Sequence, residues 1–206
     1  MNVAILKYNA GNILSVTYAL ERLGVSAVVT DNVELLQKAD RVIFPGVGEA
    51  STAMTYLKER NLDAVIKKLD QPVLGICLGM QLLLDIGSEM HEVKGLELIP
   101  GKVLALPKDQ AHLKVPNINW HPVSQLSDHP LFNSIPNNEM FYFVHSYYAQ
   151  TNFIENNIGQ TAFGSLMFSS VIAKNNIMGT QFHPELSQIN GIRLLQKFIN
   201  YHNEKF

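Results

Sequence analysis

The sequence PVLGICLGMQLLL, residues 72–84, organises the predicted fold. It begins with a short apolar run around Val73 and Ile76, which predicts a buried strand. The run breaks at GICLG, residues 75–79, and an apolar stretch with helical spacing follows at once. A glycine two positions to either side of a reactive residue, between a strand and a helix, is the arrangement of a nucleophile elbow. The sequence therefore predicts that Cys77 is presented at a sharp strand-to-helix turn.

Cys77 is the only cysteine in the chain. At an elbow its thiol would lie at the N-terminus of the following helix, where backbone N–H groups and the helix dipole favour a thiolate. The alternative is a buried structural cysteine, because an unpaired cysteine often behaves as a small apolar core residue. The pentapeptide alone leaves both interpretations open.

The composition is that of a folded chain without a strong charge. Of 206 residues, 47% are apolar and 17% are charged, so we expect a single domain over 1–206 with a sizeable core. A net charge of −2 argues against nucleic acid as the main partner. One cysteine excludes a disulfide framework and fits a reducing compartment. We find no signal-peptide pattern and no apolar run long enough to cross a bilayer, and we therefore expect a cytoplasmic protein without a membrane partner.

The first half of the chain alternates between strand and helix patterns with short connections. Asn12 is expected to cap the first helix and Gly24 to end it, and Asp31 and Asn32 are expected to open the second. The predicted strands are 3–6, 26–30, 41–44 and 73–76, and the predicted helices 12–23, 32–39, 51–60 and 62–69. This alternation is typical of a parallel sheet that is covered on both faces.

The second half contains short strands and prolines instead. We predict one aromatic strand at 139–150, hairpin strands at 161–169 and 171–174, a strand at 177–182 and a closing helix at 191–201. The expected class is therefore α/β: an open, mostly parallel sheet with helices on both faces and extra antiparallel strands at one side. In such sheets, sites gather at the carboxyl ends of the strands, where Gly46, Cys77 and residue 182 are predicted to lie.

A thiolate nucleophile needs a base and a group that orients the base. The segment GTQFHPE at 179–185 offers both just past a predicted strand. His183 can accept the thiol proton, and Glu185 can hold the imidazole by its other nitrogen. The proline between them restricts the backbone. Any of the seven histidines could instead be an ordinary core or surface residue. The segment indicates a catalytic role only because it lies at a strand end of the sheet that also presents Cys77.

Acyl transfer also needs donors aimed at the developing oxyanion. The N–H of Leu78, directly after the nucleophile, is one candidate. The PGVG loop at 45–48 is a second, because its glycines allow unusual backbone angles that could turn the N–H of Val47 or Gly48 into the site. A plain strand-to-helix turn is the alternative interpretation of this loop.

Three motifs in this order and spacing resemble those of the class I (triad) glutamine amidotransferases: PGVG at 45–48, GICLGMQ at 75–81 and HPE at 183–185. Within that group the chain is similar to the glutaminase subunits of imidazole glycerol phosphate synthases, which serve histidine biosynthesis. The segments that carry this closer resemblance are 11–16, 95–101, 114–120, 142–148 and 179–185. The similarity covers essentially the whole chain.

The resemblance implies a role for each matching residue. Cys77 would attack the side-chain amide of glutamine, His183 would pass the proton to the leaving ammonia, and Glu185 would orient His183. Water would then hydrolyse the γ-glutamyl thioester. Val47 and Leu78 would form the oxyanion hole, with the Val47 peptide rearranging first. The residues implied to hold glutamine are Gly48, Gln81, Glu89, Ser146 and Tyr147. No cofactor and no metal site is implied, and the histidines show no ligand spacing.

The resemblance also implies a partner. Such a glutaminase is nearly silent alone and is activated when a (β/α)₈-barrel cyclase subunit binds its ribonucleotide substrate. Ammonia then passes through the barrel, and the products are imidazole glycerol phosphate and an aminoimidazole carboxamide ribotide. Asn12, Trp120 and Tyr142 are the implied interface residues, although Trp120 and Tyr142 could equally be ordinary packing residues.

Three positions depart from the family pattern without touching the triad. Asn119 stands where a glycine is usual, His121 where asparagine is common, and Leu186 where a lysine often pairs with an acid of the cyclase. Other interpretations are an amidotransferase subunit of the pyridoxal phosphate synthase or anthranilate type, a cysteine peptidase, and a non-catalytic binding protein on the same fold. The segments 114–120 and 142–148 favour the histidine-pathway type, Gln81 disfavours the peptidase, and an intact triad disfavours the non-catalytic protein.

Overall fold

The computed structural model describes residues 1–8, 11–87, 93–108 and 113–201. The helices are α1 (Ile13–Glu21), α2 (Val33–Lys38), α3 (Ala50–Glu59), α4 (Leu62–Ile66), α5 (Leu78–Leu82) and α6 (Gln188–Ile199). The strands of the first half are β1 (Val3–Leu6), β2 (Ala27–Thr30), β3 (Arg41–Phe44), β4 (Val73–Ile76), β5 (Ile86–Gly87) and β6 (Val93–Lys94). Those of the second half are β7 (Gly101–Ala105), β8 (Asn117–Gln125), β9 (Glu139–His145), β10 (Tyr147–Thr151), β11 (Asn157–Phe163), β12 (Leu166–Lys174) and β13 (Ile177–Thr180).

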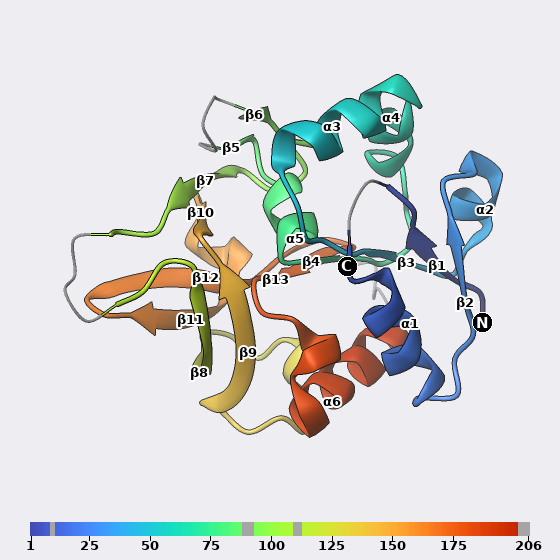
Figure 1. Cartoon of the computed structure of the whole chain (residues 1–206). Helices are drawn as coiled ribbons and strands as arrows, with labels where there is room; N and C mark the ends of the chain where they lie inside the picture. Colours follow the sequence, from blue (N-terminus) through green and yellow to red (C-terminus); the bar gives the residue numbers. More distant parts are fainter. Residues whose placement is uncertain (9–10, 88–92, 109–112, 202–206) are drawn as a thin grey trace.

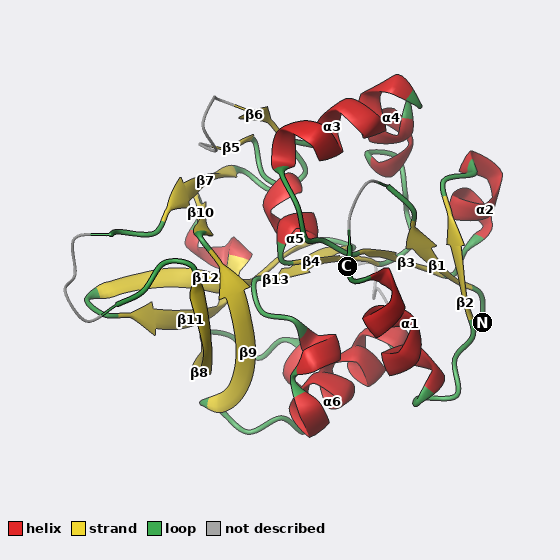
Figure 2. Ribbon diagram, in the orientation of Figure 1, coloured by secondary structure: helices red, strands yellow, loops and turns green. Residues whose placement is uncertain are grey.

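One continuous sheet runs through the molecule in the order β2-β1-β3-β4-β13-β12-β10-β7-β5-β6. Its first five strands are parallel to one another. From β12 onward the pairing is antiparallel except between β5 and β7, and β11, β8 and β9 branch from β12 as a curved extension. Figure 2 shows this extension at the left, beside the parallel part. The predicted α/β class with extra antiparallel strands at one side is confirmed.

Helices cover both faces of the parallel part (Figure 1). Alternate residues of β1 belong to the cores on opposite faces of the sheet. Val3 and Ile5 pack with α1 and α6, whereas Ala4 and Leu6 pack with α2, α3 and α4. All four residues of β1 are buried, as are those of β3 and β4. This is why β1 and β4 form continuous apolar runs in the sequence rather than alternating ones, and why β3 does so after Arg41.

The residues predicted to begin and end the first two helices are found at those positions, with one exception in their contacts. The Asn32 side chain accepts the Leu35 N–H at 3.1 Å and caps α2, and Gly24 has a φ of 73° just beyond α1, as a residue that ends a helix often does. Asn12 precedes α1 in a left-handed conformation and makes no capping hydrogen bond, so its prediction as an N-cap is wrong. Its side chain has another partner, described below.

Two predictions in the second half are wrong in their boundaries. Residues 139–150 form two strands, β9 and β10, because the chain leaves its pairing with β8 at Ser146 and joins β7 and β12 in the main sheet. The hairpin between β11 and β12 turns at Gly164, which has a φ of 60°, and not at Ser170. Ser170 lies inside β12 and is fully buried.

Candidate active site

Cys77 lies at the turn between β4 and α5, with a φ of 51° and a ψ of −105°. Few non-glycine residues adopt this backbone conformation, which is strained and is typical of functional sites. The flanking glycines are required by close packing. A Cβ atom on Gly79 would lie 2.0 Å from the Phe44 carbonyl oxygen, and one on Gly75 would lie 2.7 Å from the Gly79 backbone. The predicted elbow is confirmed.

The sheet brings the other half of the site beside this elbow. β13 runs parallel to β4 with Thr180 opposite Ile76, and the Cys77 N–H donates to the Thr180 carbonyl at 2.7 Å. The residues that follow β13 therefore lie next to the cysteine. His183 comes three residues after Thr180, and its Nδ1 is 2.7 Å from the Glu185 Oε1. The His183 and Glu185 side chains are 2% and 1% exposed, so water screens this pair little.

The charges of the three side chains favour a protonated His183. Burial lowers the pKa of His183, but the nearby Cys77 sulfur and then the Glu185 carboxylate together raise it to about 10. Glu185 raises the pKa of His183 less than Cys77 does, and its Oε2 is buried without a hydrogen-bond partner among the described residues. With Nδ1 held by Glu185, Nε2 is the nitrogen that can exchange a proton with the sulfur.

Asn12 belongs to this group of side chains. Its Nδ2 donates to the Glu185 Oε1, the same oxygen that faces His183. The left-handed backbone of Asn12, with a φ of 68°, accompanies this contact in place of a helix cap. The structure thus joins an implied interface residue directly to the implied triad, although local sequence signals had indicated a capping role for it.

We expect Asn12→Ala to lower kcat for glutamine about tenfold with little change in KM, because a hydrogen bond to a buried carboxylate orients His183 and is worth about 1.5–3 kcal/mol. Steady-state glutamate release measures both constants. Asn61 is a matched control, since it also begins a helix with a positive φ of 54° and has no capping hydrogen bond. Equal losses of kcat in Asn12→Ala and Asn61→Ala would contradict a specific role for the contact with Glu185.

A cavity of about 280 Å³ opens above Cys77. It is lined by Val47, Gly48, Cys77, Leu78, Gln81, Pro116, Val144, His145, Ser146 and Tyr147. Both implied oxyanion residues are in this set, as are four of the five implied glutamine-binding residues. The fifth, Glu89, lies outside the described residues. A cavity of this size is at the lower end of what small-molecule sites occupy.

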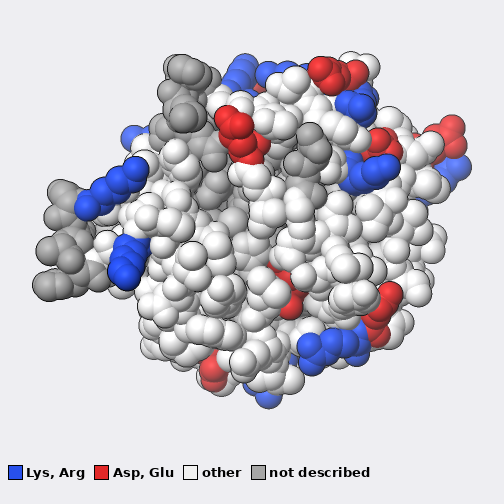
Figure 3. Space-filling view, viewed as in Figure 1, with Lys and Arg blue, Asp and Glu red and all other residues white. Residues whose placement is uncertain are grey.

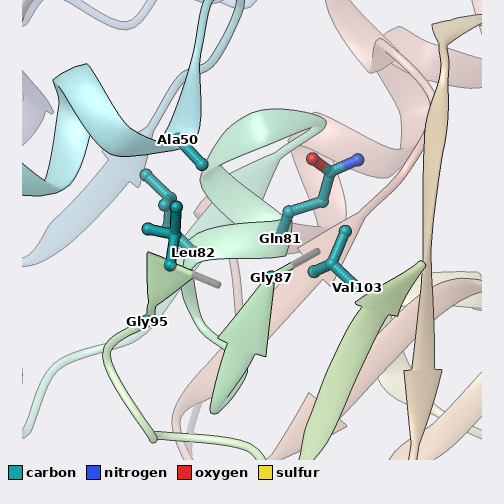
Figure 4. Close-up of a pocket in the computed structure, with 7 residues that line it drawn as sticks. Ala50, Gln81, Leu82, Gly87, Gly95 and Val103 are labelled. Atoms are coloured by element: carbon teal, nitrogen blue, oxygen red, sulfur yellow. The ribbon is translucent and has the colours of Figure 1, made fainter. Parts of the chain in front are cut away.

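Gln81 projects from α5 and also lines a much smaller cavity, shown in Figure 4 between Ala50, Leu82, Gly95 and Val103. That cavity measures about 10 Å³, which is room for about one water molecule and not for an amino acid. The Gln81 Nε2 donates to the Tyr147 carbonyl at 3.0 Å and to the Gln181 Oε1 at 3.1 Å. The implied ligand residue is therefore fixed from two sides.

The loop 45–48 is held by Gly11, which lies in a segment that carries the family resemblance, and by Tyr8, which sequence patterns did not single out. The Tyr8 hydroxyl donates to the Pro45 carbonyl, and the Gly11 N–H approaches the Val47 carbonyl at 3.4 Å. Burial and then the Cys77 charge raise the pKa of Tyr8 well above its usual value, so this hydroxyl keeps its proton. Tyr8 is 4% exposed, and an apolar strand followed by one tyrosine gave no signal of this contact.

A chain of hydrogen bonds supports the opposite wall of the cavity. His145 is 5% exposed, with Nδ1 at 2.8 Å from the Tyr147 carbonyl and Nε2 at 3.0 Å from the Asn117 Nδ2. The Asn117 Oδ1 is in turn 2.9 Å from the His121 Nε2. Burial lowers the pKa of His145 to about 4, against the effect of its bond to the Tyr147 carbonyl, so the ring is neutral at pH 7. His121, a departure from the family pattern, thus contacts Asn117, which in turn contacts the cavity-lining residue His145.

The neutral state of His145 predicts a pH dependence of stability. His145 binds a proton near pH 6.5 in the unfolded chain and only near pH 4 in the folded chain. Its contribution to the free energy of unfolding is therefore fully present above pH 6.5 and is lost as the pH falls to 4. We expect wild type to lose on the order of 3 kcal/mol more free energy of unfolding across this window than His145→Gln. Urea denaturation at several pH values measures this difference, and parallel curves would contradict it. His121 and His129, whose pKa values burial also lowers, are present in both proteins.

Trp120 and Tyr142 face each other across β8 and β9, with ring centroids 5.6 Å apart. Both are half-buried. The Tyr142 carbonyl accepts the His183 N–H at 2.9 Å, and the Tyr142 N–H donates to Ser187 Oγ at 2.9 Å. Ser187, for which sequence patterns gave no role, also donates to the His183 carbonyl at 2.6 Å. The aromatic pair is therefore attached to the turn that carries His183.

No helix within the described residues is long and apolar enough to cross a membrane. The fold resembles that of several solved structures over nearly the whole chain. A glutamine amidotransferase from Thermotoga maritima matches with a TM-score of 0.63 at 18% identity, covering 97% of this chain and 83% of that one. PurLQS from the same organism matches with a TM-score of 0.67 at 15% identity, covering 97% and 98%.

Sequence comparison is more specific than the fold. Residues 5–200 match the model of the glutamine amidotransferase class-I family. The imidazole glycerol phosphate synthase subunit HisH of Bacteroides fragilis is 47% identical over 97% of this chain and 99% of its own. The subunits HisH of Bacteroides thetaiotaomicron and Nitrosococcus oceani are 45% and 42% identical, each over 97% of this chain and over 100% and 97% of their own. The chain therefore belongs to the class I glutamine amidotransferases and, within them, to the HisH subunits of imidazole glycerol phosphate synthase.

Proposed function

We propose that the chain is a single glutamine amidotransferase domain that hydrolyses glutamine to glutamate and ammonia through a thioester on Cys77. One observation carries this proposal: the buried side chains of Cys77, His183 and Glu185 lie at a cavity of about 280 Å³ that is lined by four of the five residues implied to hold glutamine. The class of the reaction follows from the family, and the assignment of residues to steps is our own.

In the first half-reaction, the Cys77 sulfur attacks the side-chain amide carbon of glutamine, and His183 gives its proton to the leaving ammonia. The raised pKa of His183, about 10, favours the thiolate–imidazolium pair from which this step begins. Glu185 holds the imidazole by Nδ1 throughout. In the second half-reaction, His183 takes a proton from water as that water attacks the thioester, and glutamate leaves with the sulfur regenerated.

The developing oxyanion needs two donors. We assign them to the Leu78 N–H, at the start of α5, and to the Val47 peptide after a rearrangement of the loop 45–48. Glycine at position 48 supports such a rearrangement because its φ of 128° is readily adopted only by glycine. Gly48, Gln81, Ser146 and Tyr147 are assigned to the bound glutamine, and Glu89 is assigned with them from its motif alone.

We further propose that ammonia passes to a cyclase subunit of the barrel type in the cytoplasm, which uses it to make imidazole glycerol phosphate and an aminoimidazole carboxamide ribotide. The surface around Trp120 supports a docking partner. Trp120, Met140 and Ile189 line an open hollow of about 290 Å³, and Ile189 and Leu186 are 60% and 40% exposed. Figure 3 shows that the part of this face over β9 carries few charged side chains, whereas charged side chains lie over α6 and beside α1.

Glutamate release from glutamine tests this proposal in three mixtures: the chain alone, the chain with the cyclase, and both with the ribonucleotide ligand of the cyclase. We expect strong stimulation only in the full mixture. High activity of the chain alone would retain the glutaminase and remove the gating. Absence of activity in all three mixtures would refute the enzyme assignment for this pair of proteins.

A further inference from the structure

Gln181 is a fully buried amide one residue beyond the end of β13. Its backbone N–H donates to the Ser170 carbonyl of β12 at 2.8 Å, which fixes the residue in the sheet. Burial of a side-chain amide is costly unless its polar atoms are hydrogen-bonded. The partners that Gln181 uses therefore indicate why a polar residue occupies this position.

Both ends of the Gln181 amide contact the candidate active site. Its Nε2 donates to the Cys77 Sγ at 3.6 Å, and its Oε1 accepts from the Gln81 Nε2 at 3.1 Å. A hydrogen-bond donor beside a sulfur favours the thiolate over the thiol. The same side chain thus touches the implied nucleophile and the implied substrate ligand.

The contact with Gln81 also determines which atom of Gln81 is left for a ligand. Both hydrogens of the Gln81 Nε2 are used, one by the Tyr147 carbonyl and one by the Gln181 Oε1. A flipped Gln81 amide would place its oxygen against those two acceptor oxygens. Oε1 of Gln81 has no hydrogen-bond partner among the described residues, and as an acceptor it suits the α-ammonium group of glutamine rather than its α-carboxylate.

We propose that Gln181 is a positioning residue that couples the two halves of the site: its N–H stabilises the Cys77 thiolate, and its carbonyl orients Gln81 as an acceptor for the substrate. This inference rests on the proposed function, because it takes Cys77 as the nucleophile. It adds a residue to which neither the local motifs nor the family resemblance gave a role.

Two substitutions separate the two contacts. Gln181→Glu keeps an oxygen for Gln81 but replaces the donor to sulfur with a negative charge, whereas Gln181→Met removes both contacts. We expect the pH midpoint of Cys77 alkylation by iodoacetamide to rise by about one pH unit or more in both variants, since a hydrogen bond to a charged group is worth at least about tenfold in equilibrium. The KM for glutamine, measured with the cyclase and its ligand, should rise about tenfold in Gln181→Met and less in Gln181→Glu.

Gln71→Met is the matched control, because the Gln71 Nε2 donates to the Leu36 carbonyl at 2.7 Å outside the site. It should leave the alkylation profile and KM unchanged. Gln81→Met provides a second test that leaves the contact with sulfur in place: KM should rise while the alkylation midpoint stays at the wild-type value. Circular dichroism verifies that each variant is folded.

An unshifted alkylation midpoint in folded Gln181→Glu overturns the proposal, as does a KM in Gln181→Met equal to that of wild type. Cys77→Ala, assayed in parallel, separates this failure from that of the proposed function. If Cys77→Ala is inactive while the Gln181 variants behave as wild type, only the coupling role is wrong. If Cys77→Ala still hydrolyses glutamine, the nucleophile assignment fails and the coupling role fails with it.

Discussion

Cys77→Gly is expected to abolish glutamine hydrolysis and yet to give a more stable protein than Cys77→Ala. Both substitutions remove the sulfur, and loss of a nucleophile of this kind costs at least about 10⁴-fold in kcat. They differ in the backbone, because the φ of 51° and ψ of −105° at position 77 are strained for any residue with a Cβ atom. Glycine adopts such angles without that strain.

The size of the stability difference follows from two opposing terms. Relief of backbone strain of this kind is worth about 1–3 kcal/mol, and the greater freedom of glycine in the unfolded chain costs about 0.5–1 kcal/mol. We therefore expect Cys77→Gly to exceed Cys77→Ala by about 1 kcal/mol in free energy of unfolding. Urea denaturation of the two variants measures this difference, with glutamate release assayed on the same samples.

The comparison of the two variants with each other is the control, because both lack the same buried sulfur. A glycine variant that is less stable than the alanine variant would show that the elbow is not strained. Residual activity above about one part in 10⁴ in either variant would show that Cys77 is not the nucleophile. The two findings are independent, so each half of the prediction can fail alone.

How far the sequence predicts this site depends on whether the relevant contacts are local. The elbow was predictable, since Gly75, Cys77 and Gly79 lie within five residues and their spacing encodes the turn. His183 and Glu185 are likewise close in sequence. The sequence also predicted that both segments lie at carboxyl ends of strands, but the parallel pairing of β4 and β13 that places them side by side is a finding of the structure.

Contacts between distant polar residues were not predictable from local signals. Asn12 has the sequence position of a helix cap, but Glu185, 173 residues away, supplies its hydrogen bond instead. Gln181 lies in the GTQFHPE segment, but the sequence gives no role for its side chain until its two partners are known. The break at Ser146 was missed for a related reason. The aromatic segment has uniform strand propensity, and the change of partner strands is decided by tertiary packing.

Gly79→Ala is expected to destabilise the fold by at least about 3 kcal/mol, because the added methyl group has no space and its neighbours are backbone atoms. The new Cβ would lie 2.0 Å from the Phe44 carbonyl oxygen and 2.9 Å from the Phe44 carbonyl carbon. Neither atom can rotate away as a side chain can. α5 would have to separate from the end of β3, and with it the elbow from the loop 45–48.

The same displacement of α5 should reduce glutamine hydrolysis in whatever protein remains folded, because the loop 45–48 packs against Gly79. A Cβ atom on Gly46 would lie 2.4 Å from the Gly79 nitrogen. Gly87→Ala is the matched control, since its Cβ would find only ordinary contacts at 3.8 and 3.9 Å. We expect it to change the free energy of unfolding by no more than about 1 kcal/mol. The urea midpoints of Gly79→Ala and Gly87→Ala measure this difference in stability. If the two midpoints coincide, the close approach of α5 to β3 does not constrain position 79, and the glycines of the elbow need another explanation.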